Sequence, residues 1–84
     1  MPRYFFDLRD GAYLPDHEGT ELPNLQAARV AAVELAGGLL KDGAAKFWDG
    51  MEWRVEVKDE ARLLLFILDF SATDSPAVPK RAAG

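Results

Sequence analysis

The residues best suited to chemistry gather in one polar stretch near the N-terminus. Asp10, Asp16, His17, Glu18 and Glu21 all lie within residues 10–21, and closely spaced carboxylate oxygens are ligands that Ca²⁺ and Mg²⁺ favour. The spacing is not that of an EF-hand, because no glycine stands sixth from Asp10 or Asp16. The alternative is a polar turn whose Asp and Gly residues set the backbone geometry. We favour the turn and predict no metal ion and no cofactor.

Catalysis would require acid–base or nucleophilic groups that converge in a pocket. The acid–base candidates are His17 with Asp16 and Glu18, all on one loop, and a single exposed histidine is more often a surface residue than a catalyst. The sequence has no nucleophile motif and no glycine-rich phosphate loop. It has no cysteine, which excludes disulfides, thiol catalysis and zinc–thiolate sites. We therefore expect no enzyme.

Length and charge restrict the class of protein. The 84 residues suffice for one domain, and the net charge of -4 argues against a protein that binds nucleic-acid phosphates. No apolar run approaches the ~20 residues of a membrane span, and the first ten residues lack a signal-peptide pattern. We expect a cytoplasmic domain over residues 1–71, with no nucleic-acid or membrane partner. Residues 72–84 are small, polar and interrupted by proline, which predicts a disordered tail.

The elements that position these residues are organised around one predicted helix, Asn24 to Asp42. Asn24 is a good N-cap. Residues at helical spacing form one apolar stripe: Leu25, Ala28, Ala32, Leu35, Ala36 and Leu39. Gly37 and Gly38 interrupt the helix, and the favoured interpretation ends it at Ala36. The alternative is a longer helix whose small residues, with Ala27 and Val30, let a second helix approach.

Alternating apolar residues predict three long strands, Arg3 to Arg9, Glu52 to Lys58 and Leu63 to Phe70. Residues 12–14 and 20–22 are candidates for two short strands that pair at an edge of the sheet. Between the helix and the second long strand, Phe47 and Trp48 lie in a predicted loop. They either plug the core or form an exposed anchor for a partner. The fold class is α+β, an antiparallel sheet of three to four strands with one helix on one face, in the order β-(β)-α-β-β.

The last long strand is apolar on both faces, although a sheet with one helix needs only one apolar face. Pairing of the first strand with the last would give one inner face, which comprises Tyr4, Phe6, Leu8, Trp53, Val55, Val57, Leu64, Phe66 and Leu68. The remaining apolar residues, Phe5, Leu63, Leu65 and Ile67, would form an interaction patch on the far face. The alternative is that loop 12–22 or the tail covers this patch.

Three segments of the sequence carry a resemblance. PRYFFDLRDG, PDHEGTELPNLQAAR and VEVKDEARLLL resemble a family of small uncharacterised bacterial domains over about residues 2–71. The resemblance implies that the family positions are Asp16, Glu18, Gly19, Glu21, Leu22, Pro23, Leu25, Ala28 and Arg29, and it implies no activity. Relatives often have His where this chain has Asp7, and Gly where it has Ala61. The opening also distantly resembles bacterial antitoxins with a partial double-stranded-RNA-binding-like fold.

Two expectations follow for interactions. Arg29, one turn after Leu25, is expected to reach back to Glu21 or Glu18 and tie the loop to the helix, as part of a structural motif with Asp16 and Gly19. The surplus apolar strand predicts a protein-interaction module that acts as a homodimer, joined through the sheet face or at a strand edge. The alternative is an antitoxin-like protein that binds a different protein.

Overall fold

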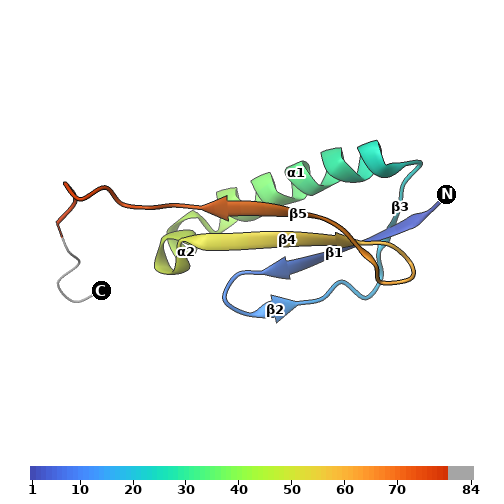
Figure 1. Ribbon diagram of the computed structural model, residues 1–84, viewed down its shortest axis with the longest axis horizontal. Helices are drawn as coiled ribbons and strands as arrows, with labels where there is room; N and C mark the ends of the chain where they lie inside the picture. Colours follow the sequence, from blue (N-terminus) through green and yellow to red (C-terminus); the bar gives the residue numbers. More distant parts are fainter. Residues whose placement is uncertain (80–84) are drawn as a thin grey trace.

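The computed structural model describes residues 1–79 and shows one helix across one face of an antiparallel sheet (Figure 1). The elements are β1 (Arg3–Arg9), β2 (Tyr13–Leu14), β3 (Thr20–Glu21), α1 (Leu25–Asp42), α2 (Ala44–Gly50), β4 (Glu52–Lys58) and β5 (Leu64–Ser71). The strand order is β2-β1-β4-β5, and β3 also pairs with β1. The α+β class is confirmed, although the sheet has five strands and the described chain has two helices.

The helix α1 begins where the sequence predicts and ends later than the favoured interpretation placed it. The Asn24 side chain accepts a hydrogen bond from the Ala27 amide at 2.9 Å. The helix then continues through Gly37 and Gly38, each of which costs ~1 kcal/mol relative to Ala. The last turn carries the half-buried Leu39 and Leu40, and their burial offsets that cost. An end at Ala36 is therefore wrong.

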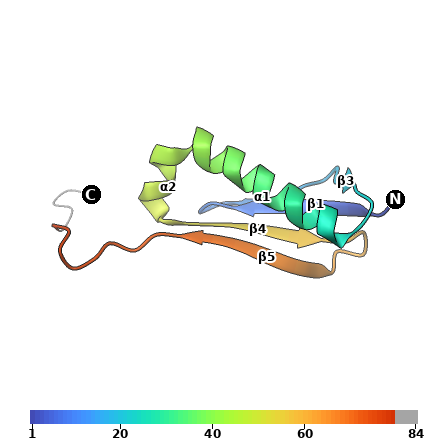
Figure 2. The ribbon, with the colours of Figure 1, turned by 90° about the horizontal axis from the view of Figure 1, so that it is seen from above.

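Three alanines bring α1 close to the sheet. Ala28, Ala32 and Ala36 are almost completely buried, and Figure 2 shows α1 running along the sheet on this side. Leu35 is 40 % exposed, so its place in the buried stripe was predicted wrongly. The contact is centred on the small residues, and the larger Leu35 side chain lies at its margin.

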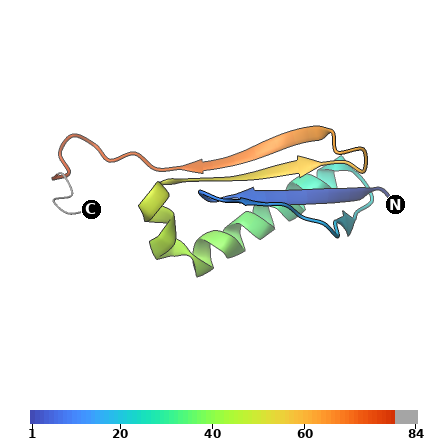
Figure 3. The ribbon, with the colours of Figure 1, turned by 90° about the horizontal axis from the view of Figure 1, so that it is seen from below.

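The strand β4 is central and separates β1 from β5, as Figure 3 also shows from the opposite side. Across the sheet, Phe6 lies opposite Val57 and Val57 opposite Phe66, while Leu8, Val55 and Leu68 form the next row. These rows face α1, and Val55 and Val57 are almost completely buried. The suggested pairing of the first strand with the last does not occur, but most of the predicted inner face forms because β4 links the two outer strands.

A register shift between Val57 and Lys58 changes the face of the sheet on which two residues of β5 lie. Val57 pairs with Phe66, but Lys58 pairs with Leu64, so Leu65 is the extra residue of a β-bulge. Leu65 packs against the core cluster, whereas Leu64 is 45 % exposed. The predicted assignments of Leu64 to the inner face and Leu65 to the far face are both wrong. Strict alternation does not hold across a bulge.

The segment predicted as a loop after α1 contains the short helix α2. Phe47 lies edge-to-face against Trp53, with ring centroids 5.6 Å apart, and also against Trp48 at 5.9 Å. Trp53 is buried, whereas Trp48 is about half exposed. Phe47 therefore closes this end of the core, and Trp48 does not share the plugging role predicted for both.

The chain after β5 extends away from the sheet at the end opposite to the N-terminus (Figure 1). Between residues 72 and 79 it contains a turn, in which the Val78 amide donates to the Ser75 carbonyl oxygen at 3.0 Å, and no helix or strand. The last five positions of the predicted tail, residues 80–84, lie outside the described residues.

Candidate functional site

The sheet face away from α1 carries a charged cluster centred on Asp7. The Asp7 side chain is fully buried and accepts hydrogen bonds from Lys58 Nζ at 2.7 Å and the Tyr13 hydroxyl at 2.8 Å. The Asp16 backbone amide donates to its other oxygen at 2.9 Å, and Arg62 approaches to 3.5 Å. These donors come from β4, β2 and two loops, so Asp7 joins four separate segments.

The partners of Asp7 determine its protonation. Burial alone would raise the pKa of this carboxyl group. The hydrogen bonds from Lys58, the Asp16 amide and Tyr13, with the Lys58 charge, outweigh burial and lower the pKa to about 2. The hydrogen bond to Asp7 also raises the pKa of the Lys58 ammonium. Both groups are therefore charged at neutral pH and form a structural ion pair.

The outer edge of β1 is closed along its length by the chain between residues 12 and 22. β3 pairs with Arg3 and Tyr4, and β2 pairs with Leu8 and Arg9. This confirms the two short edge strands predicted from sequence. Between them, Asp16 Oδ2 accepts a hydrogen bond from the Phe6 amide at 3.1 Å. The backbone groups of this edge thus have partners from the same chain.

Asp16 also forms the turn that brings this segment back to β1. Its Oδ1 accepts hydrogen bonds from the Glu18 amide at 3.1 Å and the Gly19 amide at 3.0 Å. Burial would raise the pKa of Asp16, but the bonds from the Gly19, Phe6 and Glu18 amides lower it. Both carboxylate oxygens are therefore engaged by backbone amides.

Gly19 allows the loop to lie directly on Phe5. Its φ is +72°, and a Cβ atom there would stand 2.8 Å from Arg3 Cγ and 2.9 Å from Phe5 Cε2. The Arg62 guanidinium also contacts Phe5 and lies 5.0 Å from the centre of its ring. Arg62 itself has a positive φ of 66°. Ala61 lies directly before it in the turn between β4 and β5. Phe5 is thus half-buried beneath the loop.

Glu21 and Glu18 are tied to β1 by Arg3. Arg3 Nη2 lies 3.2 Å from Glu21 Oε1, and Arg3 Nη1 donates to the Glu18 carbonyl oxygen at 2.8 Å. Within residues 1–79, no ion pair includes Arg29, which is exposed on α1. The expected contact of Arg29 with Glu21 or Glu18 is therefore wrong. Arg3 and Glu21 lie opposite each other in the β1–β3 register, and that register decides the pairing.

The acidic residues of the N-terminal stretch do not converge. Over residues 1–79, no three His, Cys, Asp or Glu side chains lie close enough together to hold a metal ion. Asp16 faces the backbone, Asp10 lies 3.6 Å from Lys46, and Glu21 pairs with Arg3. His17 is exposed on the loop. The structure thus separates the residues that looked most capable of chemistry.

The outer edge of β5 is open, in contrast to that of β1. Within the described chain, β5 pairs only with β4. Its eight residues therefore present an unpaired row of backbone amide and carbonyl groups along one side. Exposed apolar side chains surround this edge: Leu63, Leu64 and Ile67 are each at least 40 % exposed.

The predicted apolar patch on the far face is not continuous. Glu56 of β4 lies opposite Ile67, and Lys58 lies opposite Phe5. Glu56 accepts a hydrogen bond from Arg9 at 2.8 Å. Phe5 and Ile67 are therefore separated by charged side chains, and of the four residues predicted for the patch only Leu63 and Ile67 remain exposed at the open edge. Leu63 and Ile67 are exposed because they lie at the unpaired edge of the sheet, and they do not form a patch across its far face.

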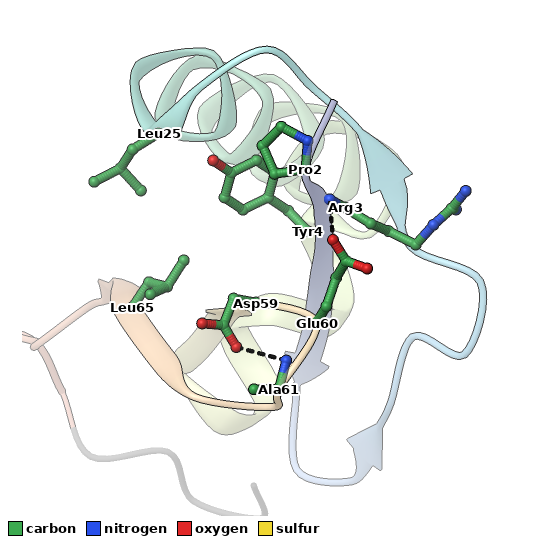
Figure 4. Close-up of a pocket in the computed structure, with 8 residues that line it drawn as sticks. All are labelled: Pro2, Arg3, Tyr4, Leu25, Asp59, Glu60, Ala61 and Leu65. Carbon is green, nitrogen blue, oxygen red and sulfur yellow. Dashed lines mark hydrogen bonds between the residues drawn. The ribbon is translucent and has the colours of Figure 1, made fainter.

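A pocket of about 490 Å³ lies at the end of the sheet that carries the β4–β5 turn. Leu25 of α1 and Leu65 of β5 extend toward each other across it, with the Tyr4 ring to one side of them (Figure 4). Asp59 and Glu60 of the turn also line it. The Arg3 side chain points away from it in Figure 4. The pocket thus has apolar walls and an acidic rim, and the register shift that places Leu65 there was not visible in the sequence pattern.

The comparison with protein families gives one result. The family described as a domain of unknown function, DUF6894, matches residues 3–71. The chain belongs to this family. The match covers β1 to β5 and ends at the last residue of β5, in agreement with the extent of the resemblance seen in the sequence. No curated protein and no solved structure matches the chain.

Within residues 1–79, neither helix combines the length and the apolar character needed to cross a membrane.

Proposed function

We propose that this DUF6894 domain is a protein-interaction module that acts as a homodimer, joined by antiparallel pairing of β5 with β5 of a second copy. The observation that carries the proposal is the open edge of β5. An exposed, long, apolar edge strand is a template for pairing with another chain. The opposite edge of the same sheet is covered by β2, β3 and the Asp16 side chain, whereas residues 1–79 provide no cover for the edge of β5.

The side chains of β5 favour a second copy as the partner. Antiparallel pairing about Ile67 would set Ile67 against its own copy and Phe66 against Leu68. Phe66 and Leu68 face α1, so this register would extend the apolar layer beneath the helix into the partner. Asp69 would lie opposite Leu65 rather than opposite its own copy, which avoids direct repulsion.

No catalytic role is part of the proposal. The two carboxylates with lowered pKa values, Asp7 and Asp16, have hydrogen-bond donors on both oxygens. These hydrogen bonds hold the β1 side of the sheet together, and they account for the lowered pKa values of both residues without a substrate.

The test is the native mass by light scattering after size exclusion, over a range of concentrations. Wild-type protein should have twice the 9.3 kDa mass of one chain. Ile67→Lys places a charge on the edge strand and should give the monomer mass with the fold retained by circular dichroism. The matched control is Val33→Lys, which changes another exposed β-branched apolar residue, on α1, and should leave the dimer intact.

Two results would overturn the proposal. Wild-type protein that is monomeric at all concentrations would remove the homodimer and leave a different protein as the partner of the edge. A dimer that Val33→Lys dissociates and Ile67→Lys does not would move the interface to the outer face of α1.

A further inference from the structure

We infer that the pocket between α1 and the β4–β5 turn receives the segment Ser75–Pro79 of the second copy. The inference rests on the proposed dimer, since it uses the antiparallel arrangement of the two β5 strands. It assigns an occupant to a pocket that residues 1–79 of the same chain leave open.

The pocket is suited to a short apolar segment followed by positive charge. Its walls are the Tyr4 ring, Leu25 and Leu65. At its rim, Asp59 Oδ1 accepts hydrogen bonds from the Ala61 and Leu63 amides. Glu60 Oε1 accepts a hydrogen bond from the Arg3 amide. Both groups keep a second carboxylate oxygen, and the Arg3 guanidinium is directed away toward Glu18 and Glu21.

The segment that follows β5 has the complementary composition. Pro76, Val78 and Pro79 are apolar, and Val78 is about half exposed, although it lies in a turn closed by a hydrogen bond. In the sequence, Lys80 and Arg81 follow directly and are the only basic residues after Arg62. An apolar anchor next to two positive charges matches an apolar pocket with two carboxylates at its rim.

Geometry favours the partner's pocket over the chain's own. The eight residues of β5 span about 26 Å at ~3.3 Å each, and the pocket lies at the start of β5, whereas the tail leaves from its end (Figure 1). Antiparallel pairing about Ile67 reverses this relation, because it sets Ser71 of one copy beside Leu63 of the other. Val78 follows Ser71 by seven residues, a reach of up to ~25 Å when this segment is fully extended. Ala61 and Leu65, which line the pocket, are each two residues from Leu63.

The experiment uses a spin label and a mixed dimer. The chain has no cysteine, so Ala77→Cys gives a single labelling site in the full-length protein. Spin-labelled chain without ¹⁵N is mixed with ¹⁵N-labelled chain that carries no spin label, and paramagnetic broadening then reports only contacts between copies. We expect broadening of the Tyr4, Ala61 and Leu65 amides.

Two matched variants separate docking from mere proximity. Val78→Asp on the spin-labelled chain should remove the broadening at the pocket, whereas Thr73→Asp adds the same charge before the apolar segment and should retain it. On the ¹⁵N-labelled chain, Ala61→Arg places a bulky cation at the pocket from an exposed position and should also remove it. All variants should keep the dimer mass.

The outcomes separate this inference from the proposed function. A dimer with no broadening at the pocket, or with broadening that Val78→Asp leaves unchanged, would overturn the docking of the tail and leave the β5 interface standing. A monomer would overturn both.

Discussion

The two edges of the sheet are built in opposite ways. At the β1 edge, β2, β3 and Asp16 occupy the backbone groups, and a buried charged cluster around Asp7 holds the covering loop in place. At the β5 edge, the described chain provides no strand, and apolar side chains are exposed. The same sheet therefore has one edge that its own chain covers and one that residues 1–79 leave unpaired.

The difference shows how 84 residues are distributed between stability and interaction. Closing the β1 edge uses the residues between β1 and α1, and these include six of the nine positions that the resemblance singled out. Open edges are a hazard that proteins usually block with charges, prolines or bulges. β5 has a bulge near its start and one charged residue, Asp69, which already lies 2.9 Å from Arg54. This contrast makes β5 the better candidate for an interface.

The largest expected effect comes from removing the charge that anchors the closed edge. Asp7→Asn leaves the half-buried Lys58 ammonium without its carboxylate, and breaking a buried pair in this way costs about 3 kcal/mol. Denaturant unfolding should show this loss. Glu21→Gln, which breaks the exposed pair with Arg3, is the control and should cost less than ~1 kcal/mol. Equal losses in the two variants would contradict the assignment of Asp7 as the anchor.

Acid should weaken the closed edge in the same way. The pKa of Asp7 falls from 3.8 to about 2 on folding, so the unfolded chain takes up the proton first as the pH decreases. The resulting stabilisation, about 2 kcal/mol, is present above about pH 4 and is lost as the pH falls toward 2. Asp16, whose pKa is also lowered, adds to the loss in the same direction. Thermal unfolding between pH 2 and 7 measures it, and Asp7→Asn should flatten the profile; an equally steep profile in that variant would exclude Asp7 as the source.

A smaller effect is expected where the loop touches β1. Gly19→Ala puts a Cβ against Phe5 at a positive φ and should lower the free energy of unfolding by about 1–2 kcal/mol. Gly37→Ala is the opposite case, because nothing lies within 4 Å of its Cβ position on α1, and it should stabilise by up to ~1 kcal/mol. Denaturant midpoints measure both. A neutral Gly19→Ala would show that the closed edge tolerates a looser loop than the structure has.

Local patterns were enough to predict the α+β class, the start of α1 at Asn24, the three long strands and the short strands that flank the loop. Each follows from neighbours in sequence: a cap, an apolar stripe or an alternation. The end of α1 could not be predicted because the two glycines disfavour helix locally, while burial of Leu39 and Leu40 is a tertiary effect. The α2 helix was missed for a related reason, since Phe47 finds its partner in Trp53 of β4.

The candidate site depended on tertiary structure to a greater extent. The sequence by itself determined which residues carry charge, which strands are apolar and that β5 has more apolar surface than one helix can cover. Only the fold decided that β4 lies between β1 and β5, so that charged residues divide the predicted patch, and that a bulge turns Leu65 into the core. The pairing of Asp7 with Lys58 spans 51 positions and depends on strand register, which side-chain alternation within one strand does not specify.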